Sequence, residues 1–242
     1  MVGLGLLPGT GVLPGRAYSS AQGVNADGTV VVGVSSATGF NVEGFSWTPT
    51  GGMVVVGLAG GTLNEALGVD GSVVVGIGTG SGIPSEEAFR WTPTGVAGLG
   101  YLTGGNFSQA FGVNRDGTVV VGGSSASGTA TNGEAFRWTQ AGGMAGLGFL
   151  TGGNFSEALA VNADGTVVVG VGNATATGAY PEAFRWTQAG GMAGLGLLPG
   201  GSFTYAEAVN ADGTVVVGYG DVTGGRRFAG PRLAACNRFR LC

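Results

Sequence analysis

A ten-residue phrase, Val-Asn-Ala-Asp-Gly-Thr-Val-Val-Val-Gly, occurs unchanged three times in the chain, at residues 24–33, 161–170 and 209–218. Close variants stand at 69–76 and 113–122. The five aspartates of the phrase, spaced 43, 46, 48 and 48 residues apart, are Asp27, Asp70, Asp116, Asp164 and Asp212. Periods of this length are typical of solenoids, propellers and arrays, so the fold is expected to be built from about five equivalent units.

Two further phrases recur inside each period. Glu-Gly-Phe-Ser-Trp-Thr stands at 43–48, and Glu-Ala-Phe-Arg-Trp-Thr stands at 87–92, 134–139 and 182–187. Gly-Gly-Met-Ala-Gly-Leu-Gly follows at 142–148 and 190–196, with looser forms at 51–58 and 95–100. Val-rich and aromatic runs bounded by Gly, Asn, Asp and Pro are typical of strands. The fourth unit therefore predicts four strands, within 156–162, 166–170, 182–187 and 191–196.

The chemistry of the repeated phrase predicts a turn followed by a strand that is covered on both faces. Asn and Asp hydrogen-bond to their own nearby backbone, and Gly takes the left-handed conformation that closes a hairpin. The run Thr-Val-Val-Val-Gly is apolar at consecutive positions, which suits a strand buried on both sides. The shorter turn of the second unit lacks two residues, an even number that leaves the facing of each side chain unchanged.

We predict an all-β chain that forms a β-propeller of about five four-stranded blades. The alternative, a parallel β-helix, would use shorter coils and fewer hairpin turns. Residues 1–9 nearly repeat residues 192–200, so the chain begins with the fourth strand of a unit. We expect this N-terminal strand to complete the last blade and close the ring, which would protect its edges. The repeat domain is assigned to residues 1–225.

The repeat stops after Gly225. Residues 226–242 hold five of the ten arginines and both cysteines, Cys236 and Cys242. Codons can be chosen for residues 225–237 whose shifted frame reads Glu-Ala-Phe-Arg-Trp-Thr-Gln-Ala-Gly-Gly-Met-Gln, close to the missing part of the repeat. We expect this tail to be a frameshifted, disordered continuation, a hypothesis that the coding DNA decides.

Composition argues against several classes of protein. The 242 residues are 43% hydrophobic and 10% charged, and they carry a net charge of −4. Nucleic-acid binding normally needs a basic patch, which the repeats lack, so no nucleic-acid partner is expected. No apolar run approaches the roughly 18 residues of a membrane-spanning helix. The first residues also lack the charged start and continuous apolar run of a signal peptide.

The combination of Glu-Ala-Phe-Arg-Trp-Thr, Gly-Gly-Met-x-x-Leu-Gly, Ser-Glu-Ala-x-Ala-Val-Asn-Ala-Asp-Gly and Val-Val-Val-Gly resembles the HAF repeat family of bacteria, over about residues 1–220. The resemblance implies a secreted or surface-exposed protein, sometimes a passenger ahead of an autotransporter barrel. It implies no enzymatic activity and supplies no catalytic residues. The extracellular or cell-surface localisation expected here comes from this resemblance.

Catalytic chemistry has little support in the sequence. The chain has no His, and all its basic residues are Arg, so the Ser–His and Ser–Lys pairs of nucleophilic catalysis are unavailable. Each Asn-x-Asp-Gly turn offers about one carboxylate, which is too few for a Ca²⁺ site, and a hairpin turn is favoured. We expect no enzyme, no catalytic, metal-binding or cofactor-binding residue, and no cofactor.

Two sets of repeated side chains allow a functional and a structural interpretation. The first is a polar ring expected at one equivalent place in the first strand of each unit, made of Gln22, Glu65, Gln109, Glu157 and Glu207. A carboxylate pair there would permit acid–base work, but a structural hydrogen-bond network is favoured. The second set is the Phe and Trp of each third strand. These residues could stack on sugars, but their strict repetition favours packing between blades.

The surface most suited to binding lies where the repeats differ, in the segments 34–42, 77–86, 123–133 and 171–181. All would lie on one rim of the propeller. The candidate binding residues are Phe40, Asn41, Glu86, Asn132, Asn173 and Tyr180.

The favoured hypothesis is a monomeric, non-enzymatic scaffold that displays these loops to a surface ligand, either a glycan or a protein. The alternatives are a carbohydrate-active hydrolytic propeller and a purely structural passenger-like segment with no ligand.

Overall fold

The computed structural model describes residues 4–7, 18–36, 42–61, 63–82, 85–126, 133–175, 180–222 and 236–237. The secondary-structure elements named within these ranges, β1 to β19 in chain order, are all β-strands. The prediction of an all-β chain is confirmed.

The strands form five antiparallel sheets, which we call blades 1 to 5. Each blade is a meander in which strands pair with their neighbours in sequence. Blade 1 consists of β1 (Ser19–Val24), β2 (Val31–Ser35), β3 (Glu43–Thr48) and β4 (Gly52–Val56). Blade 2 consists of β5 (Asn64–Asp70), β6 (Val73–Gly78), β7 (Glu87–Thr92) and β8 (Gly95–Gly98). Blade 3 consists of β9 (Ser108–Val113), β10 (Val119–Ser124), β11 (Glu134–Thr139) and β12 (Gly143–Gly146). Blade 4 consists of β13 (Ser156–Val161), β14 (Val167–Asn173), β15 (Pro181–Thr187) and β16 (Gly191–Gly194). Among the described residues, blade 5 comprises β17 (Thr204–Val209), β18 (Val215–Gly220) and β19 (Cys236–Asn237).

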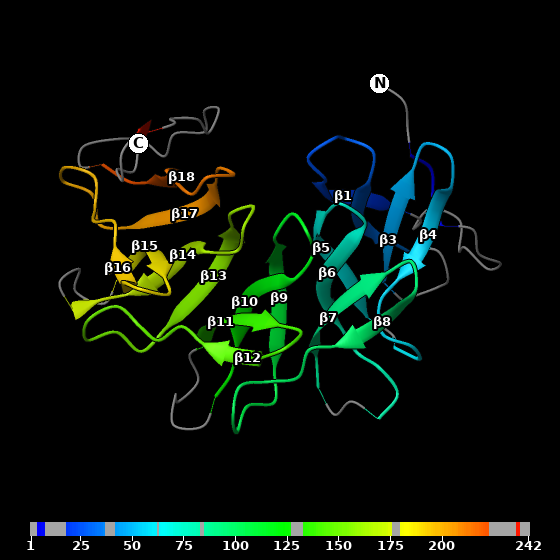
Figure 1. The fold of residues 1–242 in the computed structure, drawn as a ribbon, viewed down its shortest axis with the longest axis horizontal. Helices are drawn as coiled ribbons and strands as arrows, with labels where there is room; N and C mark the ends of the chain where they lie inside the picture. The colour runs from blue at the N-terminus through cyan, green and yellow to red at the C-terminus, as the bar shows by residue number, and fades with distance from the viewer. Residues whose placement is uncertain are drawn as a thin grey trace.

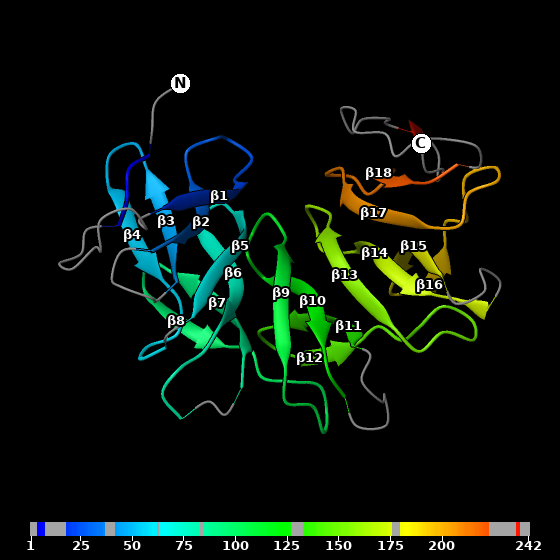
Figure 2. The same ribbon diagram turned by 180° about the vertical axis from the view of Figure 1, so that it is seen from behind.

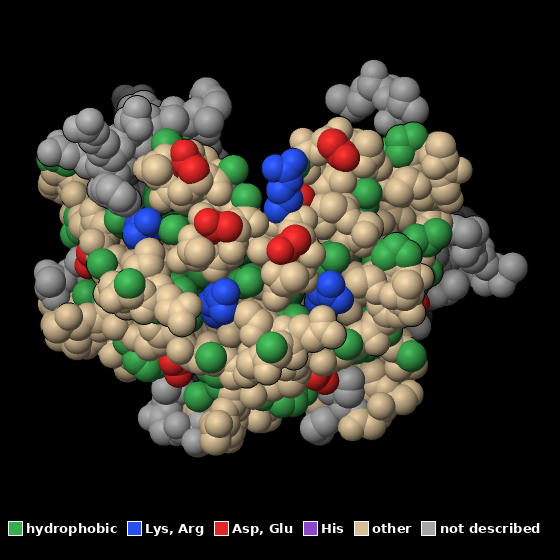
Figure 3. All heavy atoms as spheres, in the orientation of Figure 1, with side chains coloured by type: hydrophobic (Ala, Val, Ile, Leu, Met, Phe, Trp, Pro, Cys, Tyr) green, Lys and Arg blue, Asp and Glu red, His purple; other side chains and the backbone are tan. Residues whose placement is uncertain are grey.

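The blades follow one another around an arc, as Figures 1 and 2 show from opposite sides. The first strand of each blade packs against the first strand of the next, from β1 through β5, β9 and β13 to β17. Blades 1 and 5 lie on either side of an opening at the top of both views, and Figure 3 shows this edge hollowed. Repeated four-stranded sheets in this order are consistent with the blades of a propeller.

The N-terminal segment lies against blade 1 in the part that the structure describes. Leu4 and Leu7 pack in one cluster with Phe45 and Trp47 of blade 1, and the backbone N–H of Leu7 donates to the Ser35 hydroxyl at 3.4 Å. Residues 1–3, which the expected closing strand needs, lie outside the described residues. Of the expected tail, the structure describes Cys236–Asn237, whose backbone pairs with Val215 and Val216 of β18.

The Val-Val-Val run supplies both faces of each blade. Val73 and Val75 of blade 2 share a cluster with Ala110 and Phe136 of blade 3, whereas Val74 packs toward blade 1. The middle strands β6, β10 and most of β14 are buried throughout, which confirms the expected double cover. The third-strand phenylalanines of blades 1 to 4 are completely buried, and the tryptophans two residues later pack in the same clusters in blades 1, 3 and 4. These aromatic residues serve blade packing, as the favoured interpretation predicted.

The Asn-x-Asp-Gly segments form the predicted turns. In blade 4 the Asp164 carboxylate accepts from the backbone N–H of Thr166 at 3.0 Å and from its hydroxyl at 2.6 Å. Gly165 takes the left-handed conformation, with φ 75°. In blade 2 the turn tightens so that Asp70 pairs directly with Val73, and the facing of the strand is preserved, as predicted.

Every first strand contains a bulge that the sequence did not reveal. The register shifts by one residue between the fixed Ala and the next paired residue, for example around Leu159, between Ala158 and Ala160. The corresponding bulge in blade 3 brings the Gln109 carbonyl so close to Gly122 that a Cβ on Gly122 would overlap it. The glycine that ends Val-Val-Val-Gly is therefore required by the close approach of two backbones.

Candidate functional site

The segments that differ between repeats lie on one rim of the molecule. Within each antiparallel blade, the connection from the second to the third strand leaves from the same end as the linker that leads into the next blade. The Asn-x-Asp-Gly turns and the turns between third and fourth strands lie on the opposite rim. We call the first of these the loop rim.

A short polar side chain begins each loop on the loop rim and holds the start of the first strand. In blade 4 the Asn173 side-chain carbonyl accepts from the backbone N–H groups of Asn154 and Phe155, both at 2.9 Å, and its amide donates to the Asn154 side chain at 2.7 Å. In blade 5 the Asp221 carboxylate accepts from the equivalent N–H groups of Ser202 and Phe203. Residues in the same place in the other blades, each accepting a comparable bond, are Ser36, Thr79 and Ser125.

Three of the candidate binding residues, Asn173, Glu86 and Tyr180, lie among the described residues. Asn173, predicted as a ligand contact, is the last residue of β14, and its side chain accepts from the two backbone N–H groups that precede β13. Glu86 is half-buried immediately before β7, and its backbone carbonyl accepts from the N–H of Ser108 in blade 3 at 3.2 Å. Tyr180 is 58% exposed immediately before β15. The remaining candidates, Phe40, Asn41 and Asn132, lie outside the described residues.

The expected polar ring is only partly correct. Glu65, Gln109 and Glu157 occupy equivalent places, opposite Ile77, Gly123 and Val171. Counting back from the turns, their counterparts in blades 1 and 5 are Ser20 and Tyr205. Gln22 and Glu207 were assigned to the ring wrongly. They stand at the bulge, two residues further along, where the middle blades carry Leu67, Phe111 and Leu159.

Within the partial ring, Glu157 has a distinct environment. Burial raises the pKa of its carboxyl group above the ordinary value. Its side chain lies beside Gly123 of blade 3, where blades 1, 2 and 4 carry Val34, Ile77 and Val171. The absence of a side chain at Gly123 leaves room for the carboxyl group between the blades.

The Glu and Arg of Glu-Ala-Phe-Arg-Trp-Thr bind backbone groups. A side-chain oxygen of Glu87 accepts from the N–H of Gly100 at 2.7 Å, and Glu134 makes the same bond to Gly148 at 2.9 Å. Arg90 donates through Nε to the Gly117 carbonyl in the turn of the next blade, at 2.9 Å. Arg137 repeats this bond to Gly165 at 3.2 Å. The Arg contacts run between blades, whereas the glutamates bind the linker that leaves their own blade.

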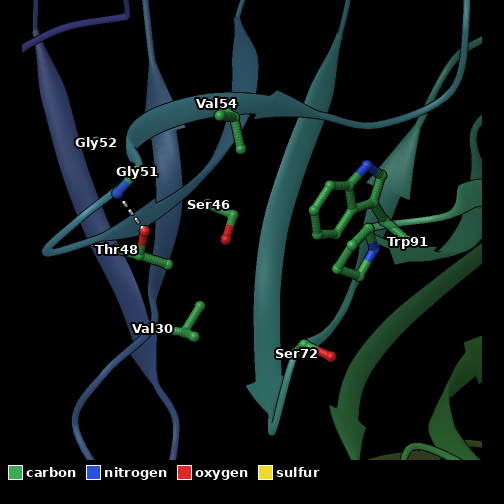
Figure 4. A pocket seen from close by; sticks show the side chains of 9 residues that line it. Val30, Ser46, Thr48, Gly51, Gly52, Val54, Ser72 and Trp91 are labelled. Atoms are coloured by element: carbon green, nitrogen blue, oxygen red, sulfur yellow. Dashed lines mark hydrogen bonds between the residues drawn. The ribbon is translucent and has the colours of Figure 1, made fainter.

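A groove lies between blades 1 and 2, where the third-strand arginine and the full-length Asn-x-Asp-Gly turn are both missing. It is lined by residues that include Ser46, Thr48, Val54, Ser72 and Trp91 (Figure 4). Ser46 stands where blades 2 to 4 carry Arg, and Ser72 belongs to the shortened turn. Neither the long side chain nor the full turn is present to fill this space. The groove is therefore a local gap in the repeated packing.

Blade 5 carries an aromatic cluster that the sequence analysis missed. The rings of Tyr205 and Tyr219 are stacked with centroids 5.0 Å apart, and Phe203 meets both edge-on. The two tyrosines are a cross-strand pair, at places where blade 4 carries Glu opposite Val and blade 3 carries Gln opposite Gly. Aligning the units from their turns, rather than by matching acidic residues, would have found this difference.

Metal-binding clusters and membrane-spanning helices are both absent from the described ranges. No group of three or more His, Cys, Asp or Glu side chains there is placed to hold a metal ion. The same residues contain no helix of the length and apolar character needed to cross a membrane. On the face shown in Figure 3, the charged side chains are scattered among neutral surface.

The fold is similar to that of two solved structures. The chain matches no protein-family model and no curated protein sequence. Its structure is similar to TolB from Acinetobacter baumannii, with a TM-score of 0.56 and 16% identity, over 84% of this chain and 49% of that chain. It is also similar to a putative TolB from Agrobacterium tumefaciens, with a TM-score of 0.55 and 13% identity, over 89% of this chain and 73% of that one. The chain thus spans about half the length of the Acinetobacter protein. These comparisons support a propeller-like fold.

Proposed function

We propose that this protein is a non-enzymatic extracellular or cell-surface scaffold that presents variable loops for adhesion or recognition. The observation that carries the proposal is that repeated residues make structural contacts, whereas the variable residues lie in the loops of one rim. The repeated Glu and Arg of the third strands bind backbone groups and so hold the blades together. The Glu87 carboxylate and the Arg90 guanidinium are examples. Groups bound in this way are poor candidates for acid–base catalysis, which weakens the hydrolytic alternative.

The loop rim supplies the recognition surface of this proposal. Its segments differ in sequence from blade to blade, and each is anchored at its start by a short polar side chain such as Asn173. Variable loops on a rigid framework are the usual place for binding. Among the described residues of the loop rim, Tyr180 is the most exposed large hydrophobic residue, and tyrosines often dominate binding energies at interfaces. The ligand class is a surface glycan or a surface protein.

Two further elements of the proposal come from the sequence. The resemblance to HAF repeats supports an exported protein of bacterial origin. The near-repeat of residues 1–9 at 192–200 supports a monomeric propeller of about five blades, whose ring the N-terminal strand completes.

The proposal is tested by presenting the full chain to an array of purified glycans and to a panel of purified extracellular matrix proteins. We expect saturable binding to at least one of them. Tyr180→Ala should lower the affinity about tenfold or more, because a central tyrosine contact contributes at least about 1.4 kcal/mol. Gln188→Ala, an exposed change on the opposite rim, is the matched control and should leave the affinity unchanged. A folded protein that binds nothing in either panel, or equal effects of the two changes, would contradict the proposal.

A further inference from the structure

One arginine is missing from the junction between blades 1 and 2. In blade 2 the third-strand Arg90 reaches the next blade and donates through Nε to the Gly117 carbonyl, and blade 3 repeats this contact with blade 4. Blade 1 carries Ser46 in the corresponding place, so the space that an arginine side chain fills at the next two junctions is left open. The Gly71 carbonyl, the counterpart of Gly117 in the shortened turn, accepts from the side-chain amide of Asn25 at 3.1 Å.

The exposure of two neighbouring residues shows that this junction is open. Val30, which lines the groove, is half-buried, whereas the equivalent valines of the following blades are buried: Val73, Val119 and Val167. Gly71 is exposed, whereas the equivalent turn glycines, which pack on those valines, are buried: Gly117, Gly165 and Gly213. The shortened turn of blade 2 therefore leaves Val30 uncovered, where a full turn covers the valine of the preceding blade.

The groove is mainly apolar and contains hydroxyl groups. Figure 4 shows Trp91, Val30 and Val54 around the same space as the hydroxyls of Ser46 and Thr48. Its volume is about 110 Å³. Ser46 is 5% exposed, and its hydroxyl has no hydrogen-bond partner among the described residues. The groove therefore offers an aromatic ring together with oxygen atoms that can accept hydrogen bonds.

We propose that this groove binds an arginine side chain of a partner protein. Arginine combines an apolar stem with a planar guanidinium that donates hydrogen bonds and stacks on aromatic rings. The stem suits Val30 and Val54, and the guanidinium suits Trp91 and the hydroxyl oxygens. Gly51 and Ser72, which line the groove, belong to turns on the rim opposite the loop rim. The site is therefore separate from the loops of the proposed function.

The charge of this part of the chain favours a cationic guest. Residues 17–89, which include all of blade 1 and most of β7, contain no Lys, Arg or His. The acidic residues of the same range are Asp27, Glu43, Glu65, Asp70, Glu86 and Glu87. Two of them stand close in sequence to the groove, Asp27 three residues before Val30 and Asp70 two residues before Ser72. A cation from a partner is therefore attracted to this junction.

The test uses the full chain, labelled with ¹⁵N, and N-acetyl-arginine amide, which imitates an arginine within a polypeptide. The indole N–H signal of Trp91, assigned by its loss in Trp91→Phe, should shift saturably with a Kd of about 1 mM, while the other three tryptophan signals stay in place. N-acetyl-citrulline amide, which has the same shape without the charge, should bind at least about tenfold more weakly. Absence of a saturable shift at Trp91, or equal affinity for the citrulline compound, would overturn the proposal.

Free L-arginine distinguishes a partner protein from a free amino acid as the source of the guanidinium. It should bind no more tightly than the blocked amide, because the residues that line the groove include no cation to pair with its carboxylate. Binding of free L-arginine about tenfold tighter than the amide would overturn the assignment to a partner protein.

Substitutions in the protein locate the site. Ser46→Arg restores the residue of the other blades and fills the groove, so it should weaken binding of the amide at least about tenfold. Gln188→Arg adds the same charge at an exposed turn of blade 4 and should leave the affinity unchanged. Thermal melting shows whether the variants are folded. Val54→Arg blocks the groove from a position that is 45% exposed, without replacing a buried residue, and should also weaken binding about tenfold. Equal effects of Ser46→Arg and Gln188→Arg, or full affinity of Val54→Arg, would place binding elsewhere and overturn the assignment.

Discussion

The hydroxyl of Ser156 in blade 4 accepts a hydrogen bond from the backbone N–H of Ala135 in blade 3, at 2.9 Å. The same hydroxyl donates to the carbonyl of Gly148, in the linker between the two blades, at 2.7 Å. Ser108 and Thr204 repeat both bonds at their own blade junctions. One buried hydroxyl thus joins the third strand of one blade, the linker and the first strand of the next.

Replacing this hydroxyl is expected to destabilise the whole array. Ser156→Ala leaves a buried N–H and a linker carbonyl without their partner, which should lower the free energy of unfolding by about 2 kcal/mol. Urea denaturation monitored by tryptophan fluorescence measures the loss. Ser72→Ala, at an exposed turn residue, is the control and should change stability by no more than about 0.5 kcal/mol. Equal losses for the two variants would show that the junction hydroxyl has no special weight.

Two adjacent glycines in β10 are expected to differ sharply in their tolerance of a methyl group. The bulge brings the backbones of Gly122 and Gln109 together, so that a Cβ on Gly122 would overlap the Gln109 carbonyl oxygen. Gly122→Ala should therefore cost at least about 2 kcal/mol. A Cβ on Gly123 would meet only the Glu157 side chain, at 3.4 Å, so Gly123→Ala should cost less than about 1 kcal/mol. Thermal unfolding of the pair measures the difference, and similar melting temperatures would refute this account of the repeated glycine.

Much of the architecture could be predicted from the sequence because its signals are local. Strand faces follow from side-chain alternation, and the turns follow from Asn, Asp and Gly, so the roles of Val73, Val74 and Gly165 were accessible. The bulge at Leu159 was not, because it depends on how the first strand meets the second. Missing it left Gln22 and Glu207 assigned to the wrong place.

The candidate site was less predictable than the fold. Asn173 stands in a segment that varies between repeats, yet its side chain does the same work as Ser125 and Asp221. Three different residue types can accept the same pair of backbone N–H groups, so differences in sequence did not imply differences in function. The stacking of Tyr205 on Tyr219 likewise depends on cross-strand register, which becomes clear only when the units are aligned from their turns.

The turn aspartates are expected to make stability fall in acid. Hydrogen bonds from a threonine hydroxyl, and then from its backbone N–H, lower the pKa values of Asp27, Asp116, Asp164 and Asp212. The unfolded chain therefore binds more protons at these sites, and the stability that they contribute is present above the ordinary pKa of about 3.9 and is lost as pH falls through the lower folded values.

A variant with all four aspartates changed to asparagine amplifies this effect through the repeat. At pH 7 its urea midpoint should be lower than that of the parent protein. The difference between the two midpoints should narrow as the pH is lowered below 4. Urea midpoints measured from pH 7 to pH 2.5 provide the comparison. A gap that stays constant over this range would mean that ionised carboxylates do not contribute to the turns.

Glu157 is expected to show the opposite dependence on pH. Burial between blades 3 and 4 raises the pKa of its carboxyl group, so the folded state resists ionisation there. The folded chain binds the proton more tightly than the unfolded chain, and the ionised group therefore lowers stability when the pH is above its raised value. Glu157→Gln should accordingly be more stable than the parent protein at pH 7 to 8. Its advantage should shrink as pH falls from the raised value toward the ordinary pKa of about 4.3, and should vanish below it.

The residue of blade 3 that is equivalent to Glu157, Gln109, allows the reverse substitution. Gln109 is half-buried at the same place in its strand, opposite Gly123. Gln109→Glu should lower the urea midpoint at pH 7 and recover it in acid, so that the two variants shift in opposite directions from the parent protein. If Glu157→Gln does not raise the urea midpoint at pH 7, the carboxyl group is solvated better than its position beside Gly123 implies. The difference between Gln109 in blade 3 and Glu157 in blade 4 would then have no electrostatic consequence.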